Sequence, residues 1–101
     1  LLSAAMKEDE NNAHFQHLAG MLLLSHGQYT ESIQTLQRAV ELDPLDGEIY
    51  FSLGKGLYAS GQVQAALEAW QTAARLAPAL ADADPMVKIL LEEQQVREAG
   101  Q

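Results

Sequence analysis

The chain has 101 residues and a net charge of −8, from six basic and fourteen acidic residues, and it contains no cysteine. This length predicts one small domain that can bury a core without disulfides. The missing cysteine excludes thiolate catalysis and cysteine-based zinc sites. The acidic balance disfavours nucleic acid, whose phosphates repel negative charge. No apolar run approaches the roughly 20 residues that span a bilayer, so we expect no membrane insertion. The composition leaves the cellular compartment open.

Helix start and stop signals divide most of the chain into four helical segments. Gly27 and Gly61 supply stops after the first and third segments. Asp43 ends the second, because the residue before Pro44 avoids helical angles. Asp46 can cap the third segment. The apolar spacing between these signals predicts helices over residues 13–26, 29–42, 47–60 and 63–76.

The C-terminal segment carries its own start signal. Asp84 is a capping carboxylate, and Pro85 follows at the first helical position. We expect this last helix to run to about Ala99, with Gly100 ending it. Its apolar stripe consists of Val87, Leu90 and Leu91.

The sequence repeats itself with a period of 34 residues. Such a period indicates stacked helical units, which commonly offer a long concave surface to a partner. Short linkers require the two helices of each unit to pack antiparallel. When residues 13–46 are laid over 47–80, the identical pairs are Gly20/Gly54, Leu23/Leu57, Gly27/Gly61, Gln28/Gln62, Gln37/Gln71, Ala39/Ala73, Leu42/Leu76 and Pro44/Pro78.

Small and large residues alternate across each predicted pair. Gly20 and Gly54 would let the second helix approach closely, because a glycine has no side chain between the two backbones. Leu36 and Trp70 would then fill the space opposite.

These positions resemble the tetratricopeptide repeat family. The first repeat departs from the family pattern at Gln16 and Ala19. Its matching residues are Gly20, Leu23, Gly27, Tyr29, Ser32, Leu36, Ala39 and Pro44. The second repeat matches throughout, with Tyr50, Leu53, Gly54, Leu57, Gly61, Ala66, Trp70, Ala73 and Pro78.

The resemblance implies an all-α fold, an α-solenoid of antiparallel helix pairs in one domain. Its expected parts are a partial repeat over residues 1–12, full repeats over 13–46 and 47–80, and a capping helix over 81–101. Leu1–Lys7 looks like the end of a truncated earlier repeat. Lys88 and Gln95 replace the two glycines of the pattern, which favours a helix that ends the array.

In this family the first helix of each pair lines the concave groove. The resemblance therefore implies a partner-binding surface of mixed apolar, aromatic and basic character. It suits a protein partner that presents an extended peptide or an amphipathic helix. The expected groove residues are His14, His17, Met21, Leu24, Phe51, Lys55 and Tyr58. The rival interpretations are that the final helix crosses this groove, or that these side chains only support helix packing.

Other chemistry finds little support in the sequence. Chaperone-binding family members hold a carboxylate with several basic and amide side chains, whereas Lys55 is the only basic residue near the corresponding positions. His14 and His17 could share a metal only with a third ligand, and none is evident. Ser25 and His26 are adjacent and cannot form a nucleophile–base pair by themselves. We therefore expect no cofactor, no metal and no catalysis.

Two alternatives to partner binding remain open. The half-repeat would expose Leu1, Leu2 and Met6, which could drive self-association into a homo-oligomer. The chain could instead be the docking segment of a longer protein, of the kind found among bacterial assembly factors.

Overall fold

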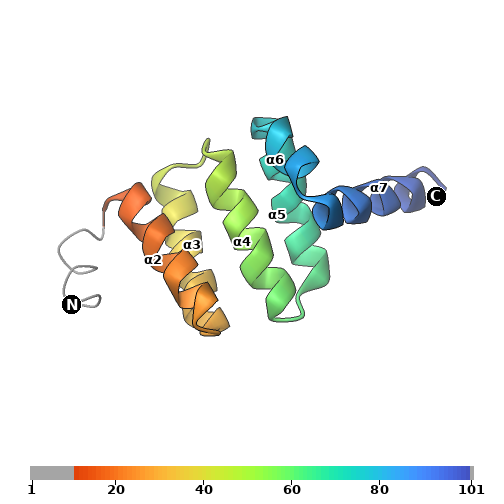
Figure 1. Ribbon diagram of the computed structural model, residues 1–101. Coiled ribbons are helices and arrows are strands. Elements are labelled where there is room, and N and C mark those ends of the chain that lie inside the picture. Colours follow the sequence, from red (N-terminus) through yellow and green to blue (C-terminus); the bar gives the residue numbers. More distant parts are fainter. Residues whose placement is uncertain (1–10, 101) are drawn as a thin grey trace.

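The computed structural model describes residues 11–100, and every regular element in that range is helical (Figure 1). The predictions of an earlier half-repeat over Leu1–Lys7 and of self-association through Leu1, Leu2 and Met6 concern residues outside this described range. The elements are α2 (Ala13–Ser25), α3 (Tyr29–Leu42), α4 (Gly47–Ala59), α5 (Val63–Leu76), α6 (Pro78–Ala83) and α7 (Pro85–Ala99). The four helices predicted for residues 13–76 are confirmed, with ends within one residue.

The helices stack as two antiparallel pairs, α2 with α3 and α4 with α5, and α3 packs against α4 between them (Figure 1). The backbones of α2 and α4 also approach each other, while those of α3 and α5 do not. The first helices of the two pairs are thus closer together than the second helices. The array is elongated, with extents of 49 × 25 × 22 Å.

The tight turns inside the two pairs depend on glycine. Gly27 has φ +77° and Gly61 has φ +90°, a left-handed conformation that side chains disfavour. Both glycines follow the helix ends that the sequence predicted.

The predicted close approach within each pair is confirmed. A methyl group added at Gly20 would overlap the Leu36 side chain, and one added at Gly54 would overlap the Trp70 ring. Trp70 is only 1% exposed, and its indole N–H donates a hydrogen bond to the Phe51 carbonyl oxygen at 3.1 Å. Small residues on the first helix of each pair thus leave room for a large buried side chain of the second helix.

One apolar core runs from α3 to α7. Leu36, Trp70 and Val87 are almost fully buried in it. The cluster consists of Ile33, Leu36, Leu53, Leu57, Ala66, Leu67, Ala69, Trp70, Ala81, Val87 and Leu91. The C-terminal helix is therefore part of the packed unit through its inner side. Within residues 11–100, no helix is long and apolar enough to cross a membrane.

The C-terminal region differs from the expected single segment. Pro78 does more than close α5, because it opens the short helix α6, which the sequence analysis did not anticipate. Asp84 is extended and separates α6 from α7, and its carboxylate accepts hydrogen bonds from the amides of Met86 at 3.1 Å and Val87 at 3.2 Å. The predicted start of the last helix is therefore confirmed.

The final helix does not cover the first helices. Among the described elements, α7 contacts α5 and α6 and no other helix. In Figure 1 it points away from the stack of α2 to α5. The interpretation that the last helix crosses the groove is therefore wrong.

Candidate partner-binding groove

The side chains expected to line the groove lie on two neighbouring helices that contact each other. α2 carries His14, His17, Met21 and Leu24, and α4 carries Phe51, Lys55 and Tyr58. The 34-residue period places Met21 level with Lys55, and Leu24 level with Tyr58.

Exposure separates these side chains into two groups. His14, Met21 and Lys55 are exposed, with Met21 at 45%, and they are open to a partner. Leu24, Phe51 and Tyr58 are partly buried, so each offers only part of its apolar surface. Partly buried side chains are held in one orientation by their neighbours, which lowers the entropy lost when they bind.

His17 has a different position from the other groove candidates. It is only 8% exposed, and its Nε2 lies 2.8 Å from the Ser52 hydroxyl oxygen. This buried hydrogen bond joins α2 to α4. His17 therefore helps to hold α2 in position against α4 and offers little surface to a partner.

Burial also changes the acid–base behaviour of His17. Desolvation lowers its pKa below the ordinary value of 6.5, because a charged imidazolium is disfavoured away from water. The carboxylates of Asp46 and Glu48 oppose this shift, and His14 adds a smaller lowering effect. At neutral pH His17 is therefore an uncharged hydrogen-bonding group.

A cation and an aromatic ring meet on the exposed side of α4. The Lys55 ammonium nitrogen lies 4.7 Å from the centroid of the Phe51 ring, within the range of a cation–π interaction. The Phe51 carbonyl accepts the Trp70 hydrogen bond described above. Lys55 is thereby held next to an apolar side chain whose backbone is tied to the core.

Tyr58 is anchored in a similar way. Its ring centroid lies 5.6 Å from that of Trp70, with an angle of 33° between the planes. Trp70 therefore supports both aromatic side chains of the groove, Phe51 through its backbone and Tyr58 through ring contact.

The surface changes character along the two helices. His14 and Glu48 lie in the first turns, where the exposed groups are polar and ionisable. Leu24 and Tyr58 lie in the last turns, where apolar groups dominate. Met21 and Lys55 stand between these ends. The candidate surface of α2 and α4 thus has a polar end, a central cation and an apolar end.

The described residues provide no obvious catalytic or metal-binding arrangement. Within residues 11–100, no three His, Cys, Asp or Glu side chains converge in a way that could hold a metal ion. The Ser25 hydroxyl donates to the Leu22 carbonyl oxygen at 2.8 Å, and His26 Nδ1 lies 2.9 Å from the same oxygen. Ser25 Oγ also lies 3.4 Å from His26 Nδ1, but the Ser25 hydroxyl is donated to the Leu22 carbonyl, so the two side chains are not arranged for proton transfer from Ser25 to His26.

Ser52 is not among the site residues expected from the sequence, and its role appears only in the structure. The available signal was its separation of 35 residues from His17, one more than the repeat period. Such an offset places two side chains on facing sides of successive first helices. The burial of both side chains, which makes this spacing a hydrogen-bonded contact, is seen only in the structure.

Comparison with known proteins agrees with the helix pairs and their close-packed glycines. A family model described as tetratricopeptide repeat matches residues 17–85, more than half of the chain. A search of curated proteins finds no match. The matched range contains most of α2, all of α3 to α6, and the Gly20–Leu36 and Gly54–Trp70 contacts. The chain belongs to the tetratricopeptide repeat family.

Proposed function

We propose that this chain is a non-catalytic adaptor that binds a segment of a partner protein along α2 and α4. Tetratricopeptide repeats generally mediate protein–protein interaction, and this family is typically non-catalytic. The observation that carries the proposal is the row formed by the exposed side chains of Met21 and Lys55 and the partly buried Phe51 ring beneath Lys55.

The chemistry of this row defines the segment that it would hold. Leu24 and Tyr58 offer apolar contact area at one end, so the partner places a bulky apolar side chain there. Lys55 stands near the centre, so the next part of the segment carries an acidic group. The polar end, with His14 and Glu48, favours a polar or basic group. The preferred segment is thus ordered as apolar, acidic, then polar or basic.

A random-peptide phage library tests this proposal without a known partner. The immobilised native chain should enrich peptides that combine an aromatic or large aliphatic residue with an acidic residue. A Met21→Glu, Lys55→Gln double variant should lose this enrichment, because it removes an apolar contact and the central cation. Both positions are exposed, so the variant should keep its helical circular dichroism.

A matched control separates local contact from overall charge. Gln34 on α3 and Gln64 on α5 are exposed, and a Gln34→Glu, Gln64→Glu variant changes the net charge by the same amount. This control should enrich the same peptides as the native chain. If the groove variant keeps the enriched motif, or the control loses it equally, α2 and α4 do not form the binding surface.

A further inference from the structure

The C-terminal helix α7 is apolar on two opposite sides. Its inner side is buried through Val87 and Leu91, and Gln94 accepts a hydrogen bond there from the Gln71 amide at 2.9 Å. Its outer side leaves Met86 48%, Ile89 54% and Val96 73% exposed. The core contacts of α7 therefore account for only one of its two apolar sides.

The exposed residues on the outer side follow the spacing of a coiled coil. Met86, Ile89, Glu93 and Val96 are separated by three, four and three residues, and we call this row the outer seam of α7. This is the spacing of the inward-facing positions in paired helices. Three of the four are apolar, and Glu93 is the one charged member. The row is therefore suited to pairing with another helix.

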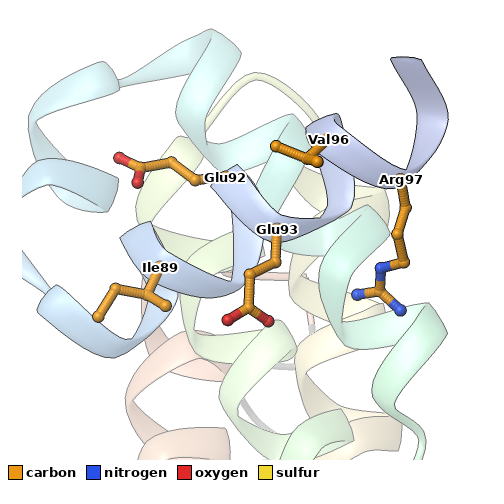
Figure 2. Close-up of a pocket in the computed structure, with 5 residues that line it drawn as sticks. All are labelled: Ile89, Glu92, Glu93, Val96 and Arg97. Atoms are coloured by element: carbon orange, nitrogen blue, oxygen red, sulfur yellow. The ribbon is translucent and has the colours of Figure 1, made fainter. Parts of the chain in front are cut away.

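Charges of both signs flank the outer seam. Glu92 and Arg97 lie on its two sides, and the three charged residues Glu92, Glu93 and Arg97 line a shallow hollow of about 520 Å³ together with Ile89 and Val96 (Figure 2). Within residues 11–100, the side chains of Glu92, Glu93 and Arg97 form no ion pair or hydrogen bond. Their charges are thus available to a partner.

We propose that the outer seam pairs in parallel with α7 of a second copy of this chain. Coiled-coil geometry places the flanking position of one helix beside the opposite flanking position five residues later on the other. Glu92 and Arg97 have this separation. A two-fold axis would therefore form two equivalent ion pairs, each between Glu92 and Arg97 of the partner subunit.

The same arrangement stacks apolar side chains and opposes one like-charged pair. Met86, Ile89 and Val96 would each meet the same residue of the second copy. Glu93 would face Glu93 of the partner subunit, and this repulsion limits the strength of the pair. Two short helices also bury less than the about 800 Å² per partner of a standard interface. The dimer should be weak and form only at high protein concentration.

Sedimentation equilibrium of the whole chain between about 10 µM and about 1 mM tests the pairing. The mass of the native chain should rise from one copy toward two across this range. Arg97→Glu should keep the mass near one copy, because it opposes like charges. Combining it with Glu92→Arg should restore the rise. Glu93→Gln should move the rise to lower concentration, because it removes the repulsion.

Lys88→Glu is the matched control, since it makes the same charge change on α7 at an exposed position outside the outer seam. It should associate like the native chain, and circular dichroism should confirm that each variant is folded. The Met21→Glu, Lys55→Gln groove variant should also associate normally, which separates this test from that of the groove. A constant one-copy mass for the native chain, equal loss in Lys88→Glu, or failure of the charge swap would overturn the proposal.

Discussion

The imidazole of His17 and the hydroxyl of Ser52 form a buried hydrogen bond of 2.8 Å that joins the first helices of the two repeats. Apolar side chains such as Ile33, Leu36 and Leu53 also pack where α3 meets α4, and such packing is non-directional. A hydrogen bond between two polar groups adds a directional restraint. It also gives the contact between the repeats a dependence on pH.

We expect the free energy of unfolding to fall as the pH drops below 6.5. His17 has a lowered pKa in the folded chain because of burial, so the unfolded chain binds a proton more readily. The contribution of His17 is complete above pH 6.5 and is lost as the pH falls through the lower folded pKa. Urea denaturation at several pH values between about 5 and about 7.5 measures the slope of the free energy of unfolding against pH.

Two histidine variants identify the source of that slope. His17→Gln should flatten the pH dependence over this range, whatever its effect on stability at neutral pH. His14→Gln removes an exposed histidine from the same helix and only the smallest of the effects on the His17 pKa, so it should change the slope much less than His17→Gln does. Equal slopes in the native chain and in His17→Gln would contradict the assignment.

Two alanine substitutions two residues apart on α4 should have opposite effects. Gly54→Ala would press a methyl group into the Trp70 ring, and we expect a loss of about 1–3 kcal/mol in the free energy of unfolding. Gly56→Ala would place its methyl group 3.4 Å from Ile33, an ordinary contact. Because alanine has a better helix propensity than glycine, Gly56→Ala should leave the free energy of unfolding unchanged or raise it by up to about 1 kcal/mol. Urea denaturation distinguishes these results, and similar losses in both variants would disprove the role of close approach.

A buried serine in the first repeat should contribute measurably to stability. Ser32 is fully buried, and its hydroxyl donates to the Gly20 carbonyl oxygen at 2.7 Å. Ser32→Ala should lower the free energy of unfolding by about 1–2 kcal/mol, because the bond is lost in a buried site. Ser25→Ala removes an exposed hydroxyl and should change it by less than about 0.5 kcal/mol. Thermal denaturation of both variants provides the comparison, and a neutral Ser32→Ala would show that the carbonyl does not need this donor.

The start of α7 should depend on one carboxylate. Asp84 accepts hydrogen bonds from the amides of Met86 and Val87, so Asp84→Ala should lower stability by about 0.5–2 kcal/mol. Hydrogen exchange at these two amides should accelerate at the same time. Asp82→Ala removes an exposed carboxylate of α6 that makes no hydrogen bond within residues 11–100, and exchange should then stay at the native rate. Unchanged exchange in Asp84→Ala would show that the cap does not hold the helix end.

The positions of the first four helices and the contacts inside each pair could be predicted from the amino-acid pattern. Glycines at Gly27 and Gly61 adopt backbone angles that other residues avoid, and Asp46 and Asp84 supply caps through bonds to amides two or three residues away. The close contact of Gly54 with Trp70 was also predicted, because short linkers make the two helices of a pair antiparallel and the same spacing of glycine and large residue recurs in both repeats. All of these features depend on local geometry or on a regular spacing.

The burial of His17, the extra helix α6 and the direction of α7 depend on packing between distant segments and were not predicted. His17 is hidden because Ser52 comes from a helix 35 residues away, and no local pattern reports that distance. The path after Pro78 depends on how α6 and α7 pack on α5. Both sides of α7 carry apolar residues, so either side could have faced the core. Packing selected the side of Val87 and Leu91, and this choice left Ile89 and Val96 exposed.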